Sequence, residues 1–129
     1  MRTDQELIDA ARAAAEKAYA RYSGFRVGCA VLTSEGAMFS SANVENASYP
    51  VSQCAEANAI NFAVSQGMTE IPVVAVACID AATVDQAYSC GRCRQIMSEF
   101  GVERVLVTTA DGEVREHPFD DLLPHRFYL

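Results

Sequence analysis

The chain has 129 residues, half of them hydrophobic, and no linker rich in Gly, Ser or Pro, so we expect one domain over residues 1–129. Its 17 acidic side chains outnumber the 10 basic ones and give a formal net charge of -7. This balance argues against nucleic acid as a partner, because nucleic-acid binders gather Lys and Arg on one face. No apolar run approaches the roughly 20 residues of a membrane span, and the charged start does not have the form of a signal peptide.

The cysteine count adds to this reading. Five cysteines without a secretory signal favour metal ligation, catalysis or a reduced core over a set of disulfides. We therefore expect a cytoplasmic protein, and a small uncharged molecule as its partner.

The first part of the chain predicts a helix followed by a hairpin. Thr3 and Glu6 have the form of a capping box, and apolar residues then recur on one helical face up to about Tyr19. Residues 25–33 and 38–44 are rich in strand formers and flank a Glu-Gly turn signal. A β-hairpin is expected there.

The second part alternates helices with strands. Residues 71–79 form a continuous Val, Ala and Ile run, which is typical of a strand covered on both faces. The other expected elements are helix 54–66, helix 90–100, strand 104–109, a short strand 113–116 and a helical turn 119–123. This order predicts an α/β fold, a three-layer α-β-α sandwich with a mixed five-stranded sheet.

Cysteines at two predicted helix starts carry the chemistry. Cys90 and Cys93 stand three apart, so both sulfurs can face one point, but such a pair also fits a redox site or a structural zinc site. Cys54 adds a third thiolate two residues before Glu56. Three protein ligands leave the fourth zinc position to water, whose pKa zinc can lower from about 15.7 to near 7. Glu56 is then the expected proton carrier, although it also fits a first-turn acid that stabilises a helix.

Longer motifs support the catalytic alternative. The sequences CAE at 54–56, CGRC at 90–93 and NVENASY at 43–49 resemble the small zinc-dependent cytidine deaminase family, as do YSGFRVG at 22–28 and LLP at 122–124. The likeness spans nearly the whole chain. It implies a cytidine deaminase-like fold, one zinc ion per chain, and hydrolytic deamination of cytidine and deoxycytidine to the uridines in pyrimidine salvage.

The resemblance also implies roles for single residues. Phe25 matches a residue that packs against the pyrimidine, and Asn43 and Glu45 match residues that bind the ribose hydroxyls. The backbone of Ala55 and the side chain of Glu56 would contact the edge of the ring. The tail aromatic Phe127 would cover a neighbouring subunit's site, which implies a homotetramer.

Two positions depart from the family pattern. Ala57 follows the CAE motif, where three-cysteine members usually have an arginine that offsets the thiolate charge, and Arg92 or Arg94 is expected to replace it. A similar CGRCR run occurs in the blasticidin S deaminases. Tyr88 and Ser89 stand where the family usually has Ser-Pro or Thr-Pro. We expect Ser89 to loosen this wall and to admit a substituent on the amine.

Alternatives to these interpretations remain open at the level of sequence. The protein could deaminate a modified cytidine or a blasticidin-like aminated heterocycle, or it could be a non-catalytic zinc-binding scaffold. Asn43 and Glu45 also fit turn caps, and Phe25 fits core packing. Cys29 and Cys78 fall in predicted buried strands, where cysteine behaves as a small apolar residue.

Overall fold

The computed structural model, which describes residues 2–129, is organised around one five-stranded sheet with strand order β2-β1-β3-β4-β5. The parallel pair is β3 with β4, and the other neighbouring strands run antiparallel. The sheet is therefore mixed, as predicted. Its strands are β1 (Val27–Leu32), β2 (Met38–Ala42), β3 (Val73–Cys78), β4 (Arg104–Thr109) and β5 (Val114–Pro118).

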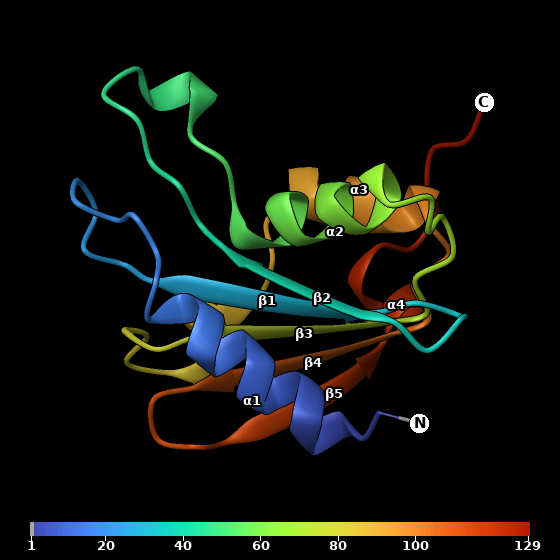
Figure 1. The fold of residues 1–129 in the computed structure, drawn as a ribbon, viewed down its shortest axis with the longest axis horizontal. Helices are drawn as coiled ribbons and strands as arrows, with labels where there is room; N and C mark the ends of the chain where they lie inside the picture. The colour runs from blue at the N-terminus through green and yellow to red at the C-terminus, as the bar shows by residue number, and fades with distance from the viewer. Residues whose placement is uncertain (1) are drawn as a thin grey trace.

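Helices cover both faces of the sheet. Helix α1 (Asp4–Ala15) packs on one face, while α2 (Ala55–Ser65) and α3 (Gly91–Glu99) lie together on the other (Figure 1). This arrangement confirms the predicted three-layer sandwich. The remaining elements are the short helix α4 (Phe119–Leu122) and the 3-10 turns η1 (Tyr49–Val51) and η2 (Val84–Ala87). None of the helices formed by residues 2–129 combines the length and apolar character needed to cross a bilayer.

Strand β3 separates two hydrophobic clusters. All six of its residues are buried, which is the burial that its unbroken apolar sequence predicts. Because side chains alternate along a strand, Val74 and Val76 face α2 and α3, while Ala75 and Ala77 face α1. Two of the three β3 side chains on the α1 side are thus alanines, beside Val73, and this helix can approach the sheet closely.

Gly28 marks the closest approach of α1 to the sheet. A Cβ atom at this position would lie 1.9 Å from the carbonyl oxygen of Ala11 and 2.5 Å from the backbone nitrogen of Ala15. We expect Gly28→Ala to lower the free energy of unfolding by about 3 kcal/mol, because backbone of α1 must move. The midpoint of thermal unfolding should fall by roughly 10 °C.

Gly91→Ala is the matched control, because no atom lies within 4 Å of a Cβ built there. Calorimetry of both variants checks the prediction. If the two variants had the same midpoint of thermal unfolding, α1 would not be packed tightly against the sheet at Gly28.

The first helix is shorter than its sequence predicts. The expected capping box is present in part, since Thr3 Oγ1 accepts a 3.1 Å hydrogen bond from the Glu6 N–H. The prediction that the helix continues to Tyr19 is wrong, because it ends at Ala15. Beyond it, the Tyr19 N–H donates to the carbonyl of Asn43, and Tyr19 pairs with Val44 in an isolated bridge. A long-range backbone contact replaces the local helical one.

Candidate active site

Three sulfur atoms meet where α2 and α3 begin. The Sγ atoms of Cys54, Cys90 and Cys93 all lie within 4.8 Å of one another. Tetrahedral zinc with Zn–S bonds of about 2.3 Å holds its sulfurs roughly 3.8 Å apart, so small side-chain movements suffice for one ion. Cys54 and Cys90 are the N-cap residues of α2 and α3, and neither side chain makes a capping hydrogen bond. Neither sulfur is committed to capping its helix.

A hydrogen bond links two of the three thiols and changes their pKa values in opposite directions. A hydrogen bond with Cys93 is the largest cause of a lowered pKa at Cys54, about 6, and the charge of Arg92 contributes further. The same hydrogen bond raises the pKa of Cys93, the partner that keeps the proton. Both helix N-termini also present backbone N–H groups and the positive end of the helix dipole to the sulfurs. One thiolate therefore forms readily, and a cation that displaces the shared proton would complete the set.

The cluster offers three protein ligands for one metal ion. Within residues 2–129, the group that can hold a metal contains Cys54, Cys90 and Cys93 alone. Cys29 and Cys78 lie buried in β1 and β3 and outside this group, in agreement with the prediction that they serve as small core residues. A tetrahedral metal in this cluster keeps one position for a molecule that is not part of the protein.

Glu56 lies beside the sulfurs as the second residue of α2. It is only 5% exposed, and Ser89 Oγ donates a 2.6 Å hydrogen bond to its Oε2. Its negative charge, together with burial as the larger cause, raises the pKa of Cys78 to about 12. A buried carboxylate next to a metal position is well placed to exchange protons there.

A cleft of about 280 Å³ opens in front of Glu56 and two of the cysteines. Its volume is close to the lower end of the range for small-molecule sites. The cleft contains every residue predicted to contact base or ribose, except the tail aromatic Phe127. These lining residues are Phe25, Asn43, Glu45, Ala55 and Glu56.

Tyr88, which the sequence placed in the wall before Cys90, also lines the cleft. Other lining residues were not predicted as site residues: Ser23, Val27, Cys78, Gln86 and Ala87. For η2, which carries Gln86 and Ala87, a signal exists, because Thr83 and Gln86 repeat the capping-box pattern and form it in the structure. For Cys78, the only sequence signal for a place in the cleft is its position at the end of the buried strand β3.

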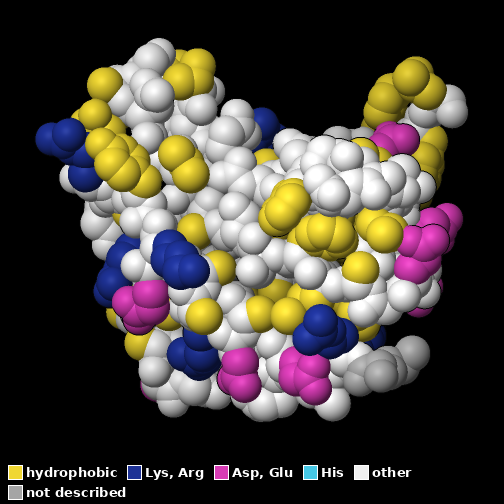
Figure 2. Space-filling view, viewed as in Figure 1, with side chains coloured by type: hydrophobic (Ala, Val, Ile, Leu, Met, Phe, Trp, Pro, Cys, Tyr) yellow, Lys and Arg dark blue, Asp and Glu magenta, His cyan; other side chains and the backbone are white. Residues whose placement is uncertain are grey.

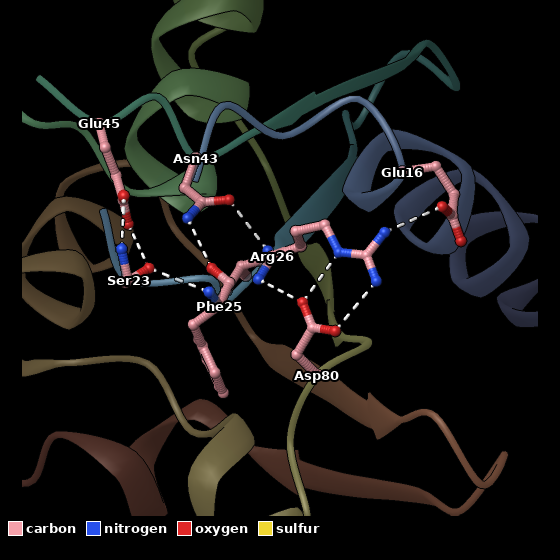
Figure 3. A network of polar contacts seen from close by, with 8 residues as sticks. Glu16, Ser23, Phe25, Arg26, Asn43, Glu45 and Asp80 are labelled. Atoms are coloured by element: carbon pink, nitrogen blue, oxygen red, sulfur yellow. Dashed lines mark hydrogen bonds and ion pairs between the residues drawn. The ribbon is translucent and has the colours of Figure 1, made fainter. Parts of the chain in front are cut away.

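Asn43 braces the segment that carries Phe25. Its Oδ1 accepts a hydrogen bond from the Val27 N–H, and its Nδ2 donates to the Phe25 carbonyl, both at 2.9 Å (Figure 3). Its side chain therefore fixes the backbone on either side of residue 26, directly before β1.

Glu45 holds the preceding turn. Its Oε1 accepts from the backbone N–H groups of Tyr22 and Ser23 at 3.0 Å, and the Ser23 hydroxyl donates to Oε2. The lowered pKa of Glu45 follows chiefly from that hydroxyl. Both Asn43 and Glu45 thus act as turn caps while they line the cleft, and their contact with ribose stays a prediction.

Arg26 extends this network from the start of β1 to α1 and to the loop after β3. Its guanidinium binds both carboxylate oxygens of Asp80, at 2.9 and 3.0 Å, and reaches Glu16 at 3.2 Å (Figure 3). The pKa of Asp80 is lowered to about 2 by this contact. The ion pair joins the end of α1 to the loop after β3, so that Phe25 is held in a rigid frame.

The two arginines of the CGRCR run have different surroundings. Arg92 is exposed, donates to Gln53 Oε1 at 3.0 Å, and lies close enough to Cys54 to lower its pKa. Arg94 is partly buried and donates to two backbone carbonyls, those of Ser89 at 2.9 Å and Leu122 at 2.7 Å. Arg92 is therefore the better placed of the two to offset thiolate charge.

Ser89 does not sit in a loose turn. It is 7% exposed, its hydroxyl binds Glu56 and its carbonyl accepts from Arg94. The expectation that a serine here loosens the wall therefore finds no support in these contacts, because both polar groups of Ser89 are engaged.

Phe127 does not join the site of its own chain. It is 67% exposed and is absent from the residues that line the cleft. Figure 2 shows hydrophobic side chains on two projections of the molecule, the segment between β2 and α2 and the C-terminal end. The tail is thus available to another molecule.

The fold and site define the class: an α-β-α protein with a three-thiol metal centre and an adjacent acid, as in zinc-dependent hydrolases. The profile described as "Cytidine and deoxycytidylate deaminase zinc-binding region" matches residues 1–109. The chain belongs to this family, and the Cys54, Cys90 and Cys93 cluster has the ligands to hold one zinc ion.

Individual relatives agree with this assignment. The cytidine deaminase of Halalkalibacterium halodurans is 38% identical over 125 residues, which cover 95% of this chain and 92% of that protein. The crystal structure of cytidine deaminase from Burkholderia pseudomallei is 42% identical, covers 98% of this chain and 100% of its own, and has a TM-score of 0.88. The blasticidin-S deaminase of Bacillus cereus is 29% identical over 106 residues, or 78% of this chain and 76% of its own.

Proposed function

We propose that this chain hydrolyses the amine of cytidine and deoxycytidine to give the uridines and ammonia, a reaction of pyrimidine salvage. One observation carries the proposal: within residues 2–129, three thiols and no fourth ligand group come together beside a buried glutamate on a nucleoside-sized cleft. The family and its relatives point to the same reaction.

The chemistry needs a nucleophile at neutral pH and a group that moves protons. When bound by the three thiolates, zinc supplies Lewis acidity and activates water. Glu56 would accept a proton in the cleft and would deliver it to the ring nitrogen and to the departing amine. We assign this transfer to Oε1, because Oε2 accepts the Ser89 hydroxyl and no hydrogen bond to Oε1 is formed within residues 2–129.

The rest of the cleft orients the substrate. Phe25 packs against the pyrimidine, and Asn43 and Glu45 receive the ribose hydroxyls. The backbone N–H of Ala55, the first residue of α2, has no partner within its helix and donates to the ring edge. The hydrogen bonds of Asn43 and Glu45 to segment 22–27 support this arrangement, because they fix the position of Phe25.

Arg92 offsets the excess negative charge of a three-thiolate zinc site. We expect Arg92→Gln to weaken zinc binding roughly threefold to tenfold, because an exposed charge is partly screened by solvent. Competition with a chromophoric chelator measures this affinity. Arg92→Lys is the control, since it keeps the charge and should bind zinc within about twofold of the original chain. Equal weakening by Lys and Gln would contradict a role for the charge.

A second substrate class is favoured by Tyr88. This side chain lines the cleft, and its hydroxyl lies 2.7 Å from His117 Nε2. The similarity to a blasticidin-S deaminase adds a reason to test larger aminated heterocycles. A panel of cytidine, N4-methylcytidine and blasticidin S decides between the classes. Turnover of cytidine alone would exclude the broader specificity.

We also propose a homotetramer in which Phe127 covers a neighbouring subunit's cleft. Support comes from the exposed apolar chain end, where Phe127, Tyr128 and Leu129 are 67%, 66% and 114% exposed. A cytoplasmic location agrees with the five free cysteines. Basic side chains form no continuous stripe on the face drawn in Figure 2, which fits a free nucleoside better than a nucleic acid.

The direct experiment is to incubate the zinc-loaded protein with cytidine and to follow uridine and ammonia. Stoichiometric appearance of both products supports the proposal. If neither cytidine nor deoxycytidine yields product, the chain is a zinc-binding scaffold or acts on another heterocycle.

A further inference from the structure

Ser89 makes a buried contact with the residue that moves protons. It lies in the turn between η2 and α3, and its hydroxyl donates a 2.6 Å hydrogen bond to Glu56 Oε2. Both residues are buried, at 7% and 5% exposure. Within residues 2–129, the structure records no second hydrogen bond to this carboxylate. The orientation of the Glu56 carboxylate therefore depends on one hydroxyl.

The backbone of Ser89 is itself held in place by Arg94. The guanidinium of Arg94 donates from Nε to the Ser89 carbonyl at 2.9 Å and from Nη1 to the Leu122 carbonyl at 2.7 Å. Because the guanidinium is planar, these two bonds hold the backbone of Ser89 in a defined position against α4. The hydroxyl then approaches Glu56 from a fixed direction.

We propose that Ser89 is a positioning residue for Glu56. By binding Oε2, its hydroxyl turns the other oxygen, Oε1, toward the cleft and holds the carboxylate in one rotamer. The inference rests on the proposed deamination, because it assigns an orientation to the group that transfers protons in that reaction. Ser89 touches neither the substrate nor the metal in this role.

Two substitutions separate the hydroxyl from the shape of the side chain. Ser89→Ala removes the donor, whereas Ser89→Thr keeps it. With cytidine as substrate, we expect kcat of the alanine variant to fall about 10- to 100-fold, because a carboxylate displaced by a fraction of an ångström transfers protons poorly. KM should stay within about threefold, and the threonine variant should keep kcat within about threefold.

Binding provides a readout that does not depend on turnover. Tetrahydrouridine has a tetrahedral C4 that carries a hydroxyl, whereas C4 of uridine is planar. By calorimetry, Ser89→Ala should weaken tetrahydrouridine about 10-fold and uridine less than about threefold, with zinc content unchanged. In a Glu56→Ala background, Ser89→Ala should have no further effect on tetrahydrouridine, because no carboxylate remains to be oriented.

Several results would overturn the inference. They are an unchanged kcat in Ser89→Ala, an equal loss in Ser89→Thr, a rise in KM alone, or a full further loss of tetrahydrouridine binding in the Glu56→Ala background. A Ser89→Ala protein that loses zinc together with activity would also overturn it, because the residue would then support the metal site. If the unsubstituted chain lacks activity but binds zinc, the proposed function fails, and the positioning role fails with it.

Discussion

Glu56→Gln is expected to lower kcat for cytidine by about 10²- to 10⁴-fold while the protein keeps its fold and its zinc. The amide has nearly the shape of the carboxylate and can still accept the Ser89 hydroxyl, but it cannot take a proton. The group that can hold the metal consists of three cysteines and does not include Glu56. Zinc should therefore stay at one per chain. Steady-state kinetics and metal analysis on the same preparation check both parts.

Glu99→Gln is the control for this change. Glu99 is the last residue of α3, is exposed and does not line the cleft, so its loss of charge should leave kcat unchanged. If Glu56→Gln kept full activity, the proton carrier would be another group. If both variants and the original chain were inactive with zinc bound, the scaffold alternative would be favoured.

Removal of one of the three cysteines that can hold zinc should lower the activity by a similar factor. Cys93 is fully buried and belongs to the three-sulfur group, so Cys93→Ala leaves two ligands, one of them exposed. We expect zinc content to fall below about 0.2 per chain and activity to fall at least 10³-fold, because neither Lewis acid nor activated water remains. Treatment of the original chain with a strong chelator should give the same loss, which added zinc reverses.

Cys29→Ala is a matched control, because Cys29 is also fully buried but lies outside the metal group. Both substitutions remove one sulfur from the core, each at a cost on the order of 1 kcal/mol, and Cys93→Ala should lose in addition the stability that bound zinc contributes. Only Cys93→Ala should lose zinc. Equal zinc content in the two variants would contradict the assignment of the cluster.

Much of the fold is encoded in short stretches of sequence. The unbroken apolar run at β3 predicted a strand buried on both faces, and this burial is complete. The capping pattern after Thr3 and the cysteines at 54 and 90 marked helix starts to within one residue. These features depend on neighbours a few residues away, and for this reason the sequence alone could predict them.

Contacts between distant segments escaped prediction. The true end of α1 depends on Tyr19 pairing with Asn43 and Val44, 24 and 25 residues away in the printed sequence. In the same way, the Ser89 hydroxyl reaches Glu56 across a separation of 33 residues. The spacing of the cysteines indicated a shared metal, but nothing local indicated which polar groups would surround the acid.

The start of α2 restricts where residues can be inserted into or removed from this chain. Cys54 is the N-cap of α2 and Glu56 its second residue, so ligand and acid share one rigid turn. Successive residues of an α-helix are rotated by about 100°, and one residue inserted between them would swing the acid to another side of the helix. Residues 47–51, in the segment between β2 and α2 that projects from the body (Figure 1), do not line the cleft. Loop grafts and length variants made to alter substrate range should therefore be confined to that projection.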